Sequence, residues 1–209
     1  MSFTSTSFKK IRSAALAGVL LAGASTVAAV GPVGAQNGGE LCNGLVATIV
    51  AVPGVPTDGT AGNDVILGTL GDDIINGRTG NDTICGLGGK DEIRGAGGVD
   101  WINGGGGGDR IFGGTGNDIL FGADGWDRMF GGDGRDNMDG GSGNDFMRGN
   151  GWADSMLGGP GNDDVHGGLA NDVLLGGSGD DWLRGSNGEN TCSDPDADTE
   201  FGGCQIRNF

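Results

Sequence analysis

The sequence predicts an all-β solenoid in which short strands stack along one axis, and three observations support this. Residues 59–193 divide into fifteen consecutive nine-residue units without an insertion or deletion. Every unit follows the pattern G-x-x-G-x-D-x-U-x, in which U is apolar and only three glycine or aspartate positions deviate. The period also overrides the composition, because 50 glycines and 5 prolines in 209 residues would otherwise indicate a disordered chain.

The pattern within one unit predicts a turn followed by a short strand. Position one is always glycine, and position four is glycine except at Trp152 and Ala170. Glycine at both positions is expected to allow positive φ and close approach of neighbouring chains, so G-x-x-G-x-D predicts the turn. In the strand, position eight faces inward and positions seven and nine face outward. Stacked units then bury one apolar strip, formed by Ile66, Ile75, Ile84, Ile93, Ile102, Ile111, Leu120, Met129, Met138, Met147, Met156, Val165, Leu174, Leu183 and Cys192.

Position six is aspartate in the first fourteen units and Asn190 in the last. Stacked strands lie about 4.8 Å apart, so these carboxylates would repel each other unless protons or cations neutralised them. Carboxylate and carbonyl oxygens in flexible turns favour calcium over magnesium. The predicted metal ligands are Asp64, Asp73, Asp82, Asp91, Asp100, Asp109, Asp118, Asp127, Asp136, Asp145, Asp154, Asp163, Asp172 and Asp181.

Units such as GGTGNDILF (113–121) and GGSGNDFMR (140–148) resemble the calcium-binding nonapeptide of the repeats-in-toxin (RTX), or hemolysin-type, proteins. The resemblance covers about two-thirds of the chain. It implies a right-handed parallel β-roll with two repeats per coil, so that odd and even turns line opposite edges. Each Ca²⁺ would lie between a turn and the turn two repeats later, which gives up to thirteen inter-turn sites.

Residues 1–35 are expected to be a secretory signal peptide. Lys9, Lys10 and Arg12 precede an apolar run over 14–30, and Ala35 ends a small-residue cleavage site. The alternative is an uncleaved membrane anchor, but the run is short and interrupted by glycine. The mature chain is therefore expected to be secreted, without a membrane span, and to fold where calcium is abundant.

The segments on either side of the repeats are expected to be caps. In the N-terminal cap, residues 36–58, a strand over 41–52 precedes a proline-containing loop; a decayed first repeat is the alternative. The C-terminal cap spans 194–209.

An exported chain with four cysteines is expected to form disulfides, here Cys192–Cys204 and Cys42–Cys85. The alternative for Cys192 is a buried thiol. No pair has the C-x2-4-C spacing of a zinc site.

Charge and motifs narrow the function classes. The formal net charge is −16, and removing the predicted signal removes three cations, so nucleic acid is not expected as a partner. The chain has one histidine, His166, and no G-x-S-x-G motif, so we expect it not to be an enzyme.

The outward positions differ between even and odd repeats. Even repeats have five of the seven repeat arginines and four aromatic residues, whereas odd repeats have one charge in sixteen positions. The first pattern indicates either arginines stacked on neighbouring rings or a site for an anionic glycan or a cell surface.

The sequence thus predicts a secreted calcium-binding protein that folds on binding Ca²⁺ and has a surface-display or adhesive role. One alternative is an ice-binding or adhesin-type roll, although Thr-x-Asn occurs only at 79–81 and 115–117. Another is an export or stability module from a larger RTX toxin or exoenzyme, which the predicted N-terminal signal disfavours. The sequence does not indicate the oligomeric state.

Overall fold

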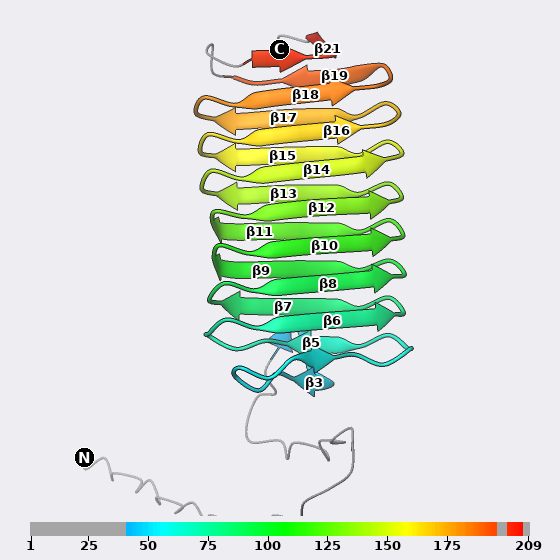
Figure 1. Cartoon of the computed structure of the whole chain (residues 1–209), viewed down its shortest axis with the longest axis vertical. Coiled ribbons are helices and arrows are strands. Elements are labelled where there is room, and N and C mark those ends of the chain that lie inside the picture. The colour runs from blue at the N-terminus through cyan, green and yellow to red at the C-terminus, as the bar shows by residue number, and fades with distance from the viewer. Residues whose placement is uncertain (1–40, 196–199, 207–209) are drawn as a thin grey trace, which may run out of the picture. The chain divides into compact units, whose positions relative to one another are not determined.

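A computed structural model describes residues 41–195 and 200–206 as a solenoid of stacked strands (Figure 1). These residues contain twenty-one strands and no helix. Nineteen strands form two parallel sheets, one with nine strands and one with ten, and the other two form a hairpin. The predicted signal peptide, residues 1–35, lies outside the described residues.

Even repeats form the nine-stranded sheet and odd repeats form the ten-stranded sheet. The nine-stranded sheet contains β4 (Thr57–Asp58), β6 (Ile74–Thr79), β8 (Glu92–Gly97), β10 (Arg110–Thr115), β12 (Arg128–Asp133), β14 (Phe146–Gly151), β16 (Asp164–Gly168), β18 (Trp182–Ser186) and β20 (Glu200–Gly202). The ten-stranded sheet contains β3 (Ile49–Val50), β5 (Val65–Leu67), β7 (Thr83–Gly88), β9 (Trp101–Gly107), β11 (Ile119–Gly125), β13 (Asn137–Ser142), β15 (Ser155–Pro160), β17 (Val173–Ser178), β19 (Asn190–Ser193) and β21 (Cys204–Ile206).

Each strand of the repeat region pairs with the strand two repeats away. Ile111 of β10, for example, pairs with Ile93 of β8 on one side and with Met129 of β12 on the other. A shift of eighteen residues between partners means that two repeats complete one coil. The register therefore confirms the predicted parallel β-roll.

The core is the strip that the sequence predicts. All fifteen residues at position eight are at most 1% exposed, and they form one continuous cluster. Ile49 packs against this cluster at its N-terminal end and Cys204 at its C-terminal end. In the repeat region, each strand contributes one apolar side chain to the space between the sheets, and burial of this strip holds the two sheets together.

The predicted division of each unit into turn and strand is partly wrong. Most strands begin at position seven and continue through position three of the next unit; β10, for example, runs from Arg110 to Thr115. Gly114 pairs with Gly132 and Thr115 with Asp133 in the adjacent coil, so these positions still belong to the ladder. The turn itself is therefore confined to positions four to six.

The sequence predicts one strand over 41–52, and this prediction is wrong. The N-terminal segment forms the antiparallel hairpin β1 (Leu41–Cys42) and β2 (Leu45–Val46), followed by β3. Asn43 and Gly44, with φ of 50° and 77°, make the two-residue turn. Asn-Gly is the pair that such turns favour, so the sequence did contain this signal.

The segment has two parts with different roles. Strands β3 and β4 extend the two sheets by pairing with β5 and β6, so this part stacks as an incomplete coil. Cys42 forms a disulfide with Cys85, with their Cα atoms 5.7 Å apart, and both residues are buried with Leu67. The hairpin therefore covers the N-terminal end of the outer face of the ten-stranded sheet.

The sheets also continue past residue 193, where the repeat pattern ends. Strands β20 and β21 pair with β18 and β19, and a disulfide joins Cys192 to Cys204 with their Cα atoms 5.6 Å apart. Cys192 is thus both a core residue and half of a disulfide. Within residues 41–195 and 200–206, no helix is long and apolar enough to cross a membrane.

Candidate calcium site

The fourteen aspartates at position six form two buried ladders, one along each edge of the roll. Each is at most 8% exposed. In each of the thirteen gaps between stacked turns, the backbone N–H of one aspartate donates to Oδ1 of the residue at position six two repeats later; Asp100 donates to Asp118 in this way at 2.9 Å. One carboxylate oxygen of each pair therefore helps to fix the spacing of the coils.

The second carboxylate oxygen has no such role in most of the ladder. From repeat 3 to repeat 13, Oδ2 of every aspartate is buried and accepts no hydrogen bond. A buried carboxylate oxygen without a partner is costly, and native proteins rarely keep one unless a ligand or ion satisfies it. This row of eleven oxygens is therefore the candidate site for a cation.

Glycine at position one opens a space beside this oxygen. A Cβ atom on Gly140 would lie 2.6 Å from Asp145 Oδ2 and 2.6 Å from the carbonyl oxygen of Gly158 in the next coil. Gly113 stands in the same relation to Asp118 Oδ2 and to Gly131. These glycines have no positive φ, so the expectation for position one is only half right: a side chain is excluded by close approach alone.

The donor set fits Ca²⁺. Each gap brings a carboxylate oxygen and a backbone carbonyl oxygen to the same small space, and a hard cation that accepts six to eight oxygens suits that set. Within the described ranges, no three His, Cys, Asp or Glu side chains lie close enough to share a metal ion.

Burial raises the pKa of the eleven aspartates from repeat 3 to repeat 13. For Asp118, desolvation raises the pKa to about 7; the hydrogen bond from Asp100 opposes the shift, and the charges of Asp100 and Asp136 add to it. For Asp100 and Asp172, desolvation raises the pKa to about 6, against the opposing hydrogen bond from the backbone of Asp82 or Asp154. Without cations, burial thus makes these carboxyl groups bind protons more readily than exposed aspartates do.

The first two repeats place their aspartates differently. In repeat 1, the backbone N–H and the hydroxyl of Thr60 both donate to Asp64 Oδ2, at 2.6 Å and 2.9 Å. Thr69 holds Asp73 Oδ2 with the same two distances in repeat 2. We call these two the threonine-closed turns. Their aspartates belong to the ladder, but the oxygen that faces the gap already has two donors.

Positive φ is found at positions two and four from repeat 3 onward, rather than at positions one and four. Position two adopts φ of 69° to 81° even where it is not glycine, at Arg78, Leu87, Ala96, Ala123, Asn150 and Ser186. Trp152 and Ala170, the exceptions at position four, have φ of 73° and 80°. Sequence reasoning missed position two because its residue type varies.

Position five was also missed. The side-chain oxygen of one residue accepts the backbone N–H of position five two repeats later, as Asn81 does from Val99 at 2.9 Å. The same bond is made by Asn63, Asp72, Asn117, Asn144, Asn162 and Asn171. The frequent Asn or Asp at this position was the available signal.

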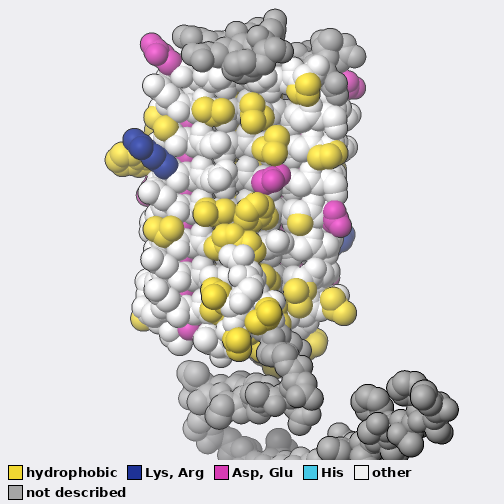
Figure 2. Space-filling model, turned by 180° about the vertical axis from the view of Figure 1, so that it is seen from behind, with side chains coloured by type: hydrophobic (Ala, Val, Ile, Leu, Met, Phe, Trp, Pro, Cys, Tyr) yellow, Lys and Arg dark blue, Asp and Glu magenta, His cyan; other side chains and the backbone are white. Residues whose placement is uncertain are grey.

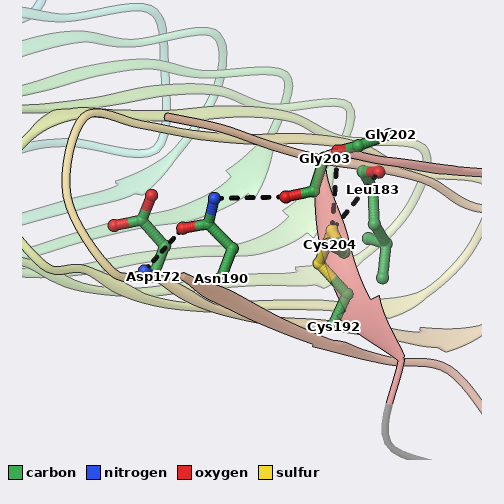
Figure 3. Close-up of a disulfide and its surroundings, with 7 residues drawn as sticks. All are labelled: Asp172, Leu183, Asn190, Cys192, Gly202, Gly203 and Cys204. Carbon is green, nitrogen blue, oxygen red and sulfur yellow. Dashed lines mark hydrogen bonds between the residues drawn. A yellow bond between two sulfur atoms is a disulfide. The ribbon is translucent and has the colours of Figure 1, made fainter. Parts of the chain in front are cut away.

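Asn190 ends the odd ladder in the way shown in Figure 3. Its Oδ1 accepts the N–H of Asp172 at 2.8 Å, as an aspartate would. Its Nδ2 donates to the carbonyl oxygen of Gly203 at 3.3 Å, a bond that a carboxylate cannot make. The exchange keeps the ladder bond and ties the last repeat to the following coil, beside the Cys192–Cys204 disulfide.

Comparisons with known proteins agree with this geometry. A comparison with curated protein sequences finds no significant match. The family model for the RTX calcium-binding nonapeptide repeat matches residues 58–93, 86–120, 103–138, 121–156 and 157–192, which together cover more than half of the chain. The chain therefore belongs to the family of RTX calcium-binding nonapeptide repeat proteins.

Proposed function

We propose that this chain is a secreted calcium-binding protein whose turns bind stacked Ca²⁺ ions and whose roll folds as they bind. The proposal rests on the row of buried Oδ2 atoms that have no hydrogen-bond partner. Each of these atoms lies beside a position-one glycine, where an added Cβ would clash with the oxygen. Bound Ca²⁺ would neutralise carboxylates that otherwise repel one another along each edge.

The structure favours eleven of the thirteen gaps. In each gap, the Oδ2 atom that faces it belongs to the lower-numbered repeat, as Asp145 Oδ2 faces the carbonyl oxygen of Gly158. In the first gap of each edge this oxygen belongs to Asp64 or Asp73 and is already bonded to threonine. The remaining gaps, between the turns of repeats 3 to 15, would hold the ions.

Two further features support export and coupled folding. The two disulfides suit an oxidising compartment, where free Ca²⁺ is also abundant enough to fill weak sites. Ions that bind only the folded roll stabilise it by mass action, so folding would await secretion. We propose that the folded roll then displays its outer faces to a partner, in a surface-display or adhesive role.

The test is a calcium titration of the chain from residue 36 onward, followed by calorimetry and circular dichroism. In excess chelator we expect little β-structure, and millimolar Ca²⁺ should produce cooperative folding with about eleven ions bound. Magnesium should replace Ca²⁺ poorly. A β-rich spectrum in chelator that Ca²⁺ leaves unchanged would contradict the proposal.

A further inference from the structure

The two outer faces of the roll differ in character. Figure 2 shows a face on which hydrophobic side chains gather and charged ones are few. The outer face of the nine-stranded sheet, by contrast, has arginines and rings in two columns along the roll, at positions seven and nine. We call these residues the arginine–aromatic face: Arg94, Arg110, Phe112, Arg128, Phe130, Phe146, Arg148, Trp182 and Arg184.

The rings of this face form a continuous path across five coils. Phe112 stacks on Phe130 with ring centroids 5.2 Å apart, and Phe130 lies 5.9 Å from Phe146. His166 lies 5.6 Å from Phe146 and 6.4 Å from Trp182. The register of the strands fixes this path, so the rings offer a preformed track along the long axis of the roll. It is apolar except at His166, whose Nε2 lies 2.6 Å from Asp164 Oδ1.

The arginines lie beside the track, and only some of them form ion pairs within the protein. Arg128 lies 5.7 Å from the centroid of Phe146, and Arg184 lies 4.5 Å from that of Trp182. Glu92 forms ion pairs with Arg94 and Arg110. Within residues 41–195 and 200–206, Arg128 and Arg148 have no ion pair, so their guanidinium groups remain available to an anion.

A groove of about 570 Å³ lies where this face meets the even edge. Three repeats line it at positions five to seven: Trp126, Asp127 and Arg128, then Asn144, Asp145 and Phe146, then Asn162 and Asp164. Asp127 and Asp145 belong to the ladder of position-six aspartates, whose charge bound Ca²⁺ would offset. The Trp126 side chain is exposed, at 72%, although large aromatic rings are usually buried. Among the described residues, the side-chain nitrogens of the two asparagines donate no hydrogen bond, whereas their oxygens accept backbone N–H groups.

We propose that the arginine–aromatic face and this groove bind a linear anionic polysaccharide. Exposed rings stack on the apolar faces of sugars, side-chain amides bond to hydroxyls, and arginine pairs with carboxylate or sulfate groups in two-pronged geometry. The face repeats every coil, at a spacing of about 4.8 Å. A linear polymer could therefore occupy several coils at once.

The inference rests on the proposed function, because the charge of the chain opposes it until Ca²⁺ is bound. The formal net charge is −16 for all 209 residues and −19 from residue 36 onward, because residues 1–35 contain three cations and no anion, and this charge repels a polyanion. Eleven Ca²⁺ ions would add twenty-two positive charges and reverse the sign of the net charge. Polysaccharide binding should therefore require Ca²⁺ even though the ions lie inside the turns and not on the face.

The experiment measures binding to the Ca²⁺-loaded chain from residue 36 onward by calorimetry at physiological salt. The probes are hyaluronan oligosaccharides for carboxylate, dextran sulfate for sulfate, neutral dextran for the sugar backbone alone, and single-stranded DNA for a polyanion without sugar stacking on rings. We expect binding of one or both anionic polysaccharides, weaker binding at high salt, and no binding of neutral dextran.

The variant Arg128→Gln/Arg148→Gln should weaken binding by about tenfold for each charge removed, because each substitution removes a charged hydrogen-bond donor to the anion. Trp126→Ser should weaken it as well. Arg135→Gln, on the odd edge, is the matched control and should change nothing. Equal affinity of the double variant and the parent, or an equal loss in the control, would overturn the inference, as would DNA binding as tight as polysaccharide binding.

Calcium uptake and circular dichroism of the same samples separate the two proposals. If the chain takes up Ca²⁺ and folds but binds neither anionic polysaccharide, polysaccharide binding by the arginine–aromatic face is refuted and calcium-coupled folding is not. A chain that is folded and binds polysaccharide in chelator supports the face, but it refutes both calcium-coupled folding and the expected requirement of polysaccharide binding for Ca²⁺.

Discussion

The first coil and the later coils are built from the same nonapeptide, yet they form two kinds of turn. In the threonine-closed turns, a side chain of the same repeat satisfies the carboxylate oxygen that faces the gap. From repeat 3 to repeat 13, the equivalent oxygen is buried without a donor. The comparison teaches that the aspartate alone does not define a calcium turn, and that position two decides how its carboxylate is satisfied.

The residue at position two explains the difference. Threonine is β-branched and avoids positive φ, and neither Thr60 nor Thr69 adopts it. Gly62 and Gly71, at position four of the same repeats, also lack positive φ. The later repeats have other residues at position two and place both positions in the left-handed region. The first coil is therefore expected to depend less on Ca²⁺ than the coils that follow.

The largest expected effect is that of pH on the calcium-free later coils. Their aspartates have pKa values raised above the ordinary 3.8, to about 7 for Asp91, Asp118 and Asp154, because burial disfavours the charge. A raised pKa in the folded state stabilises it fully below the unfolded value and loses this effect as pH rises through about 7. In chelator, β-structure should therefore increase as pH falls from 8 to 5.

Circular dichroism at a series of pH values checks this prediction. With Ca²⁺ present the trend should reverse, because protons compete with the ions for the same carboxylates. If the chelated chain loses β-structure on acidification, the assignment of the raised pKa values to the folded ladder is wrong.

The next effect concerns glycine at position four. Gly143→Ala should destabilise the Ca²⁺-loaded chain by about 3 kcal/mol, because the added Cβ would lie 2.6 Å from the carbonyl carbon of Gly125 at a φ of 137°. Gly71→Ala is the matched control in the first coil. Its Cβ would meet nothing closer than the Thr69 hydroxyl at 4.0 Å, so stability should hardly change. Equal losses of stability in Gly143→Ala and Gly71→Ala, measured by thermal or urea unfolding, would show that the two kinds of turn do not differ at position four.

The Cys42–Cys85 disulfide should stabilise the first coil specifically. Replacing both cysteines by serine should cost about 2–4 kcal/mol, as expected when a cross-link is lost. Amide hydrogen exchange should show lost protection mainly in β5 and β7, where the hairpin covers Leu67. Removal of Cys192–Cys204 is the comparison and should affect the opposite end of the roll. A uniform loss along the roll would indicate that neither disulfide acts locally.

Thr69→Ala should have a smaller effect that depends on Ca²⁺. The substitution removes the hydroxyl bond to Asp73 Oδ2 but keeps the bond from the backbone N–H of residue 69, so it should cost about 1.5 kcal/mol, as expected for one hydrogen bond to a charged group. Added Ca²⁺ should restore part of this stability and raise the number of bound ions. Thr115→Ala, at an exposed position three, is the matched control. A loss that Ca²⁺ does not reduce would show that the first coil cannot adopt the later geometry.

The smallest expected effect is that of Ala170→Gly. Ala170 has φ of 80° at position four, where glycine adopts the same conformation at less cost, so the variant should gain about 1 kcal/mol. In a partial chelation series followed by residue-resolved NMR, the odd edge should also lose ions before the even edge, from its C-terminal end. In the variant, the two edges should lose their ions at more similar chelator concentrations. Unchanged stability and an unchanged order of ion loss would speak against strain at Ala170.

Much of the molecule follows from the sequence because its requirements are local. Every residue at position eight is in the core, and every predicted aspartate is in a buried ladder, since a nine-residue period repeats the same side-chain directions. The Asn43–Gly44 turn and the asparagines at position five were visible in the sequence as well. They were missed because neither belongs to the recurring glycine, aspartate and apolar positions.

What the sequence alone determined is the period, the apolar strip and the spacing of the carboxylates, because each depends on residues within one or two units. What only the tertiary structure decided is which atoms meet across a gap. A glycine at position one is required by an oxygen eighteen residues away, and the predicted Cys42–Cys85 disulfide is made by a hairpin that lies on β5 and β7 rather than by the single strand that the sequence predicts. These contacts join coils, and the distance between coils is fixed by stacking rather than by any single repeat.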